Sequence, residues 1–98
     1  MQMTFKYTLK KQRKEIYQIA QLYGAHNIRL FGSVNTESDK IDSDVDFLVD
    51  LEKGRSLLDL AGLVHDLQQL LNKKVDIVTE NGLHWYIKEK ILSEAEPL

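Results

Sequence analysis

The sequence predicts one small α/β (α+β) domain, in which a mixed β-sheet is flanked by helices. The chain has 98 residues, the length of a single domain with one hydrophobic core. Helix-like and strand-like patterns alternate along it, in the order helix, strand, short helix, strand, helix, strand, helix. About 23 residues, including a helix, separate the second and third strands, which indicates a parallel pair; the shorter segment between the first two allows an antiparallel pair. We therefore expect residues 1–98 to form one domain around a sheet of three or more strands.

The amino-terminal third predicts a helix followed by a strand. Residues 1–9 alternate apolar and polar side chains and indicate a short strand or a loose arm. Residues 10–23 carry apolar side chains at helical spacing, and Gly24 is a suitable end for that helix. The stripe consists of Ile16, Ile19, Ala20 and Tyr23. Residues 26–31 predict a short strand, and residues 34–40, which have few apolar side chains, predict a short helix or a turn.

Two further strands are predicted at residues 43–51 and 74–79. In the first, one face would carry Val45, Phe47, Val49 and Leu51, and the other Asp44, Asp46, Leu48 and Asp50. In the second, Val75 and Ile77 would share one face, and Asp76 and Val78 the other. Each strand therefore presents an apolar face to a core and an acidic face elsewhere.

The clearest helix lies between these strands. Residues 56–59 resemble a capping box, and the helix should end near Asn72. Its predicted buried stripe is Leu57, Leu60, Ala61, Val64, Leu67 and Leu71. A last helix is expected at residues 83–94, with Pro97 ending the ordered part of the chain.

Composition excludes several classes of protein. There is no cysteine, which excludes disulfides and thiolate zinc sites. The net charge of -2 argues against a general nucleic-acid-binding protein. No apolar run approaches the roughly 20 residues that span a bilayer. We expect a cytoplasmic protein.

Three carboxylates are the candidate catalytic and metal-binding residues. Asp44 and Asp46 share a strand face, and Asp76 would join them if the next strand is adjacent and in register. Two such charges about 4 Å apart repel by ~4 kcal/mol at an effective dielectric of 20. A divalent cation would relieve that repulsion, and oxygen ligands suit Mg²⁺ or Mn²⁺. The alternative is the solvated face of an ordinary half-exposed strand.

Gly32 and Ser33 form a candidate phosphate-binding turn. Glycine lets backbone N–H groups approach a phosphate, and the serine hydroxyl adds a donor. The alternative is a plain strand-to-helix turn. The turn and the carboxylates would lie on neighbouring strands, where one metal-bound triphosphate could touch both.

These residues resemble a known signature. Gly32-Ser33, ten further residues and Asp44-Val45-Asp46 are similar to the GS-x10-D-x-D motif of the polymerase-beta-like nucleotidyltransferases. RSLLDLAGLVHDLQQLLNKKVDIVTENGL and HWYIKEKILSEAEPL resemble the remainder of the minimal nucleotidyltransferase (MNT) domains within that superfamily. Many members carry an Arg-Gly shortly after the Gly-Ser. In this sequence, Lys40 is the only basic residue within residues 34–40.

The resemblance implies a two-metal nucleotidyl transfer from ATP with Mg²⁺. Asp44 and Asp46 would hold both ions, Asp76 would complete the second site and act as base, and Gly32 and Ser33 would bind the phosphates. Family members of this length resemble antitoxins of type VII HEPN/MNT toxin–antitoxin systems, which implies transfer of AMP to a tyrosine hydroxyl of a HEPN-domain RNase toxin.

Two alternatives stay open. The chain could be a non-catalytic antitoxin that masks the toxin by binding, or a transferase that acts on a small molecule or an RNA end. A partner would need an exposed surface, for which Trp85 and Tyr86 are candidates, although such side chains are more often core.

Overall fold

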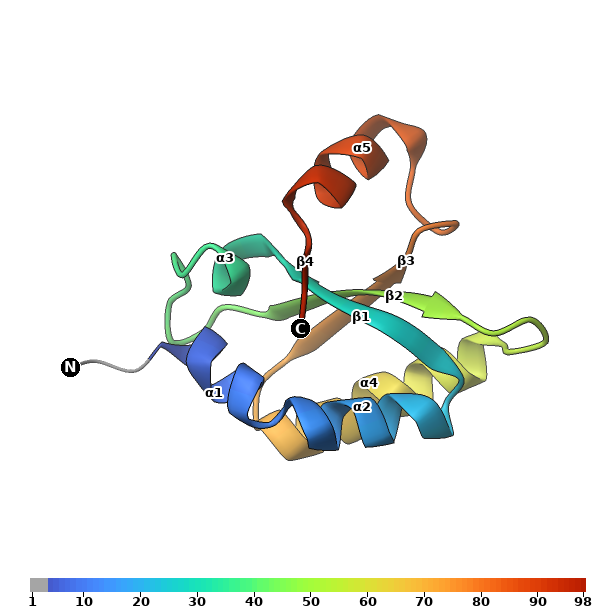
Figure 1. Cartoon of the computed structure of the whole chain (residues 1–98), viewed down its shortest axis with the longest axis horizontal. Coiled ribbons are helices and arrows are strands. Elements are labelled where there is room, and N and C mark those ends of the chain that lie inside the picture. Colours follow the sequence, from blue (N-terminus) through green and yellow to red (C-terminus); the bar gives the residue numbers. More distant parts are fainter. Residues whose placement is uncertain (1–3) are drawn as a thin grey trace.

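The computed structural model describes residues 4–98, which form a four-stranded sheet in the order β3-β2-β1-β4 with helices on both faces (Figure 1). The strands are β1 (Ala25–Phe31), β2 (Val45–Leu51), β3 (Val75–Thr79) and β4 (Glu96–Pro97). The helices are α1 (Phe5–Lys11), α2 (Arg13–Leu22), α3 (Gly32–Asn35), α4 (Leu57–Leu71) and α5 (Trp85–Glu94). None of the helices in residues 4–98 combines the length and the apolar character needed to cross a membrane.

The predicted mixed sheet is confirmed. Strand β1 runs antiparallel to β2, and β2 runs parallel to β3. Helix α4 lies in the β2–β3 connection, as the length of that segment predicts. The two strands that carry the candidate carboxylates are therefore neighbours.

The core lies between the sheet and helices α2 and α4, which cover the same face (Figure 1). From β2 it receives Val45, Phe47 and Val49, all essentially inaccessible to solvent. Full burial of side chains of this kind contributes about 1.5–3 kcal/mol each. Leu48, which points to the other face, is buried as well. The middle of β2 is thus covered on both sides, which fixes the strand that carries Asp46.

The prediction for residues 1–9 is wrong where the structure describes them; residues 1–3 lie outside the described range. Residues 5–11 form helix α1, whose first turn is capped by the Thr4 hydroxyl accepting from the Tyr7 N–H. The apolar residues Phe5 and Leu9 are four apart, so they match a helix face as well as a strand. Burial of Leu9 against the core decides for the helix.

Helix α4 has the predicted start. Its buried face overlaps the predicted stripe at Leu67 and Leu71, and Leu60 and Val64 are partly buried against the core. Ser56 and Asp59 form the capping box. The buried residues are Leu63, Leu67 and Leu71, whereas Leu57 is 82% exposed and Ala61 is exposed too. The spacing of the leucines fits more than one stripe, and contact with β3 and α2 selects the one that faces the sheet.

The carboxyl-terminal segment differs from the prediction. Pro97 does not end the ordered part: it lies in β4, and the following Leu98 is buried and donates its N–H to the Ile28 carbonyl. A proline is tolerated there because β4 is an edge strand.

Helix α5 stands off the other face of the sheet and buries none of its residues (Figure 1). Trp85 and Tyr86 are 79% and 75% exposed, so these two candidates for a partner surface are accessible to solvent and are not core residues.

Candidate active site

The Gly-Ser turn follows directly from β1. Phe31 is the last residue of the strand, and Gly32 opens α3 with a φ of 76°. A Cβ atom at Gly32 would overlap the Asp46 carboxylate. Both the left-handed backbone and the lack of space therefore require glycine. The Gly-Ser turn is therefore in contact with Asp46, one of the three candidate carboxylates.

The sheet register brings the carboxylates together from two strands. Asp46 of β2 pairs with Asp76 of β3 on one side and with Phe31 of β1 on the other. Directly paired residues share a face, so Asp46 and Asp76 project from the same side of the sheet. Asp44 precedes β2 by one residue and has the same parity as Asp46. The predicted convergence of two strands is thus present at this end of the sheet.

The electrostatics of Asp46 reflect this crowding. Burial, the charge of Asp76 and the charge of Asp44, in that order, raise the pKa of Asp46 from 3.8 to about 6. Asp76, by contrast, is exposed to solvent at the edge strand β3. The site therefore has an inner carboxylate, Asp46, that contacts the Gly-Ser turn, and an outer carboxylate, Asp76, that is open to solvent.

The three carboxylates suit a hard cation in chemistry, but they do not close around one point. Across residues 4–98, no three histidine, aspartate or glutamate side chains are grouped tightly enough to hold a metal ion. The donor set nevertheless consists of carboxylate oxygens alone, which is the preference of Mg²⁺ and Mn²⁺. Asp44, Asp46 and Asp76 are the carboxylates of this site that could ligate such an ion.

The segment after the turn contains the features that the sequence did not reveal. Asn35 of α3 is buried, 5% exposed, and ties this segment to neighbouring elements. Glu37 adopts a φ of 59°, a left-handed conformation that glycine accepts more readily. A buried asparagine beside polar neighbours gives no periodic signal, so only the structure identifies it.

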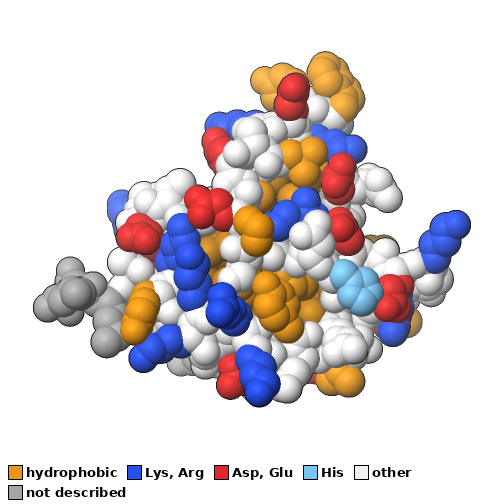
Figure 2. All heavy atoms as spheres, viewed as in Figure 1, with side chains coloured by type: hydrophobic (Ala, Val, Ile, Leu, Met, Phe, Trp, Pro, Cys, Tyr) orange, Lys and Arg blue, Asp and Glu red, His pale blue; other side chains and the backbone are white. Residues whose placement is uncertain are grey.

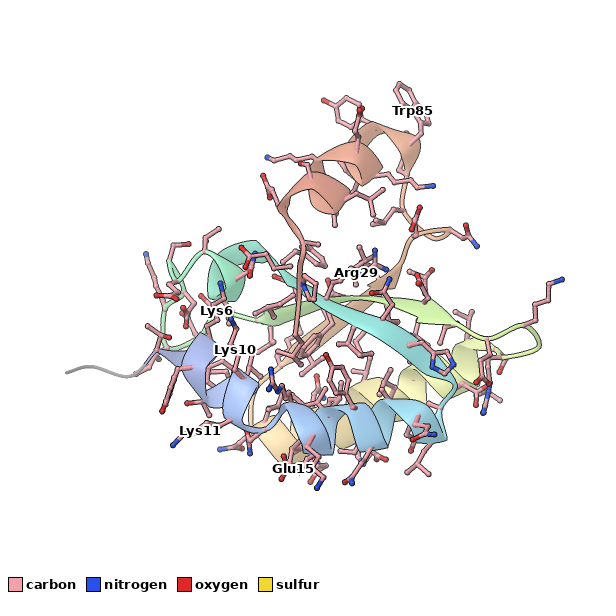
Figure 3. The ribbon with its side chains drawn as sticks, in the orientation of Figure 1. Lys6, Lys10, Lys11, Glu15, Arg29 and Trp85 are labelled. Carbon is pink, nitrogen blue, oxygen red and sulfur yellow. The ribbon has the colours of Figure 1, made fainter. Side chains whose placement is uncertain are left out.

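A cation also lies on the carboxylate-bearing face. Arg29 of β1 is two residues before Phe31 and therefore on the same face. It is paired with Asp50 at 2.9 Å and points toward the side of the sheet where α5 lies (Figure 3). Arg29 thus balances one of the acidic side chains of this face.

A mixed sheet in which a Gly-Ser turn contacts one of two in-register carboxylates defines a nucleotidyl-transfer class of protein. The sequence model of the family described as "Nucleotidyltransferase domain" matches residues 8–98. The chain belongs to this family, and within it to the minimal nucleotidyltransferases. A solved structure of a provisionally named minimal nucleotidyltransferase is 43% identical, with a TM-score of 0.87, and the match covers 98% of this chain and 97% of that one.

Relatives with known names are similar over most of their length. A provisionally named protein adenylyltransferase of Methanocaldococcus jannaschii is 39% identical over 85% of this chain and 89% of its own. The protein adenylyltransferase MntA of Thermococcus cleftensis is 38% identical over 79% of this chain and 78% of its own. A chain from a toxin–antitoxin crystal structure with AMP-PNP has a TM-score of 0.74 at 19% identity, covers 86% of this chain and 69% of its own, and shows the same fold.

Proposed function

We propose that this protein is a protein adenylyltransferase that acts as the antitoxin of a HEPN/MNT pair. It would transfer AMP from ATP to a tyrosine hydroxyl of a HEPN-domain RNase toxin. The observation that carries the proposal is the contact of the Gly32 turn with Asp46, which is itself in register with Asp76. The names of the similar adenylyltransferases, and the shared fold of chains from toxin–antitoxin complexes, support it.

Each candidate site residue has a separate role in the proposed reaction. Gly32 and Ser33 bind the β- and γ-phosphates through backbone N–H groups and the hydroxyl. Asp44 and Asp46 would hold two Mg²⁺ ions, and Asp76 would complete the second site; Mn²⁺ has the same ligand preference. When bound, such ions stabilise the charge that develops on the phosphates. Because Asp46 has a pKa of about 6 without metal, it is mostly ionised at neutral pH.

Asp76 is the proposed base. Its exposed position on the edge strand β3 lets an acceptor hydroxyl approach. The acceptor oxygen forms a bond to the α-phosphorus, the bond to pyrophosphate breaks, and the hydroxyl proton passes to Asp76. Products are the AMP-tyrosine of the partner and pyrophosphate.

In this proposal the partner brings the acceptor hydroxyl to the site. Trp85 and Tyr86 lie at the tip of α5, where Figure 2 shows hydrophobic side chains projecting from the surface. Exposed aromatic side chains are enriched at protein interfaces. We propose this tip as part of the toxin-binding surface, and expect Trp85→Ala with Tyr86→Ala to weaken the complex without lowering stability.

One alternative has a specific observation in its favour. A non-catalytic antitoxin would mask the toxin by contact alone, and residues 34–40, which contain Glu37 and Asp39 but no arginine, favour it. A transferase for a small molecule or an RNA end is the third candidate. The retained pair Asp46 and Asp76 argues for catalysis.

The decisive experiment follows label from α-³²P-ATP with Mg²⁺ to the toxin encoded beside this gene. Label on a toxin tyrosine, lost in Asp46→Asn and Asp76→Asn, is the expected result. Transfer that survives both substitutions contradicts the mechanism. Inhibition of the toxin without any label supports the masking antitoxin, and label on an RNA end or a small molecule supports the third candidate.

A further inference from the structure

The Gly32-Ser33 turn is anchored by Asn35, the last residue of α3, which is hydrogen-bonded to two other segments of the chain. We call this set of contacts the Asn35 junction. Asn35 lies two positions after Ser33. Among residues 4–98, it is the single polar or charged residue that is buried. Its Nδ2 donates to the backbone carbonyl of Glu94, the last residue of α5, at 3.0 Å. Its own backbone carbonyl accepts from Lys6 Nζ at 2.8 Å.

The junction joins three segments that are distant in sequence. Lys6 reaches from α1, and its Nζ is also 3.6 Å from the Glu96 carboxylate in β4. Figure 3 shows Lys6 on the side of α1 that lies toward α3. The amino-terminal helix and the carboxyl-terminal segment thus both attach to α3, whose first residue is Gly32.

The side chain of Asn35 is a costly choice for packing alone. Its Oδ1 is buried without a hydrogen-bond partner in the described structure. A buried amide with an unpaired acceptor is less favourable than an apolar side chain of similar volume. The hydrogen bond from Asn35 to Glu94 therefore contributes more to the position of α3 than to the stability of the fold.

Position matters here because the other end of α3, at Gly32, has no clearance. The Gly32 backbone lies against the Asp46 carboxylate, so a small shift of α3 changes the spacing between the phosphate turn and the carboxylates. We propose that Asn35 is a positioning residue, which sets that spacing by anchoring α3 to the end of α5. The proposal rests on the nucleotide transfer proposed above.

The test compares Asn35→Leu with the full-length wild type. Leucine keeps the branched shape and the number of heavy atoms of the side chain, although it is bulkier. It removes the donor to the Glu94 carbonyl and also removes the unpaired Oδ1, so the unfolding midpoint should change little. The Kd for Mg–ATP, measured by calorimetry, should increase about five- to tenfold, the loss expected when one hydrogen bond no longer holds the site. Amide exchange at residues 32–36 should quicken in the absence of nucleotide.

Tyr23→Phe is the matched control. It removes a side-chain hydrogen bond of 2.6 Å to Asp66, which links α2 to α4 away from α3. Its Kd for Mg–ATP should change less than about twofold, even if its unfolding midpoint falls.

The outcomes separate the two proposals. If the wild type binds Mg–ATP and Asn35→Leu binds it equally well, Asn35 has a structural role only and the assignment is overturned. If Asn35→Leu loses stability and affinity together, as a globally destabilised variant would, the assignment is overturned too. If the wild type itself binds no Mg–ATP, the proposed transfer fails first and the assignment falls with it.

Discussion

At the scale of single residues, Asp46 combines three constraints. It lies against Gly32, pairs with Asp76 across two strands and is half-buried. Its pKa of about 6 lies above the ordinary 3.8, so the folded state holds the proton more tightly than the unfolded state. The stability of the metal-free protein must then fall as the pH rises from about 3.8 to about 6.

Asp46→Asn should remove this pH dependence. We expect the metal-free variant to be more stable than the wild type by about 1–2 kcal/mol at pH 7.5, a value reduced for solvent screening, with the gain vanishing near pH 4. Asp44→Asn should give a smaller gain, because its charge contributes least to the shift. Urea unfolding in EDTA at several pH values measures the difference.

Asp50→Asn is the control for this prediction. Asp50 lies on the same strand face but is paired with Arg29 at 2.9 Å, so its removal should bring no gain. An equal gain in both variants would mean that general negative charge, and not the carboxylate cluster, destabilises the protein.

Glu37 is a residue whose backbone conformation lowers the free energy of unfolding. Its φ of 59° is disfavoured for a residue with a Cβ atom. Glu37→Gly should raise the free energy of unfolding by roughly 0.5–1 kcal/mol, the relief of strain less the entropy that glycine adds to the unfolded chain. Glu37→Ala removes the same charge and keeps the Cβ, so a gain of the same size in that variant would contradict the backbone explanation. Thermal unfolding of the two variants decides.

At the scale of elements, the two carboxyl-terminal helices, α4 and α5, differ in the contacts that stabilise them. Helix α4 has a capping box and buries three leucines against the sheet, whereas α5 buries no residue. Local opening costs least where few apolar contacts must break. Helix α5 is therefore the element of this fold most easily adapted to a partner, although the Asn35 junction holds its end.

Hydrogen exchange should show this difference. We expect the mid-helix amides of α5 to exchange at least about tenfold faster than those of α4, since the free energy of local opening is lower. Exchange followed by NMR on the isolated protein measures it, and addition of the toxin should slow α5 and leave α4 unchanged. Equal protection of both helices in the isolated protein would contradict the prediction.

At the scale of the whole molecule, the candidate site residues come from strands β2 and β3, from the residue before β2 and from the turn that follows β1. Ligand binding to this end of the sheet must therefore stabilise the domain as a unit. A ligand at 100 times its Kd adds about 2.7 kcal/mol, and each kcal/mol shifts the midpoint of a domain of this size by roughly 4–8 °C.

Mg–ATP at saturating concentration should therefore raise the unfolding midpoint of the wild type by roughly 10–20 °C. The shift should be much smaller in Asp46→Asn and Asp76→Asn, and with AMP in place of ATP, because the proposed site contacts the triphosphate through the carboxylates and the Gly-Ser turn. Differential scanning fluorimetry provides the measurement. A full shift in the Asp76→Asn protein would remove Asp76 from the proposed metal site.

The sequence by itself determined the features that depend on local spacing. Alternation of apolar and acidic residues placed Asp46 and Asp76 on strands, the length of the β2–β3 connection made those strands parallel, and Gly32 with Ser33 marked the turn. These follow from the periods of helix and strand and from the conformational freedom of glycine, which are properties of short segments.

Only the tertiary structure decided which apolar faces find a partner. Residues 5–11 are a helix because Leu9 packs into the core, and α4 buries Leu63 because that face meets the sheet. The strand β4 and the Asn35 junction depend on contacts between the two ends of the chain. Trp85 stays exposed because α5 stands away from the sheet (Figure 1). Hydrophobic spacing records that a face is apolar, but contacts between distant segments determine whether it is covered.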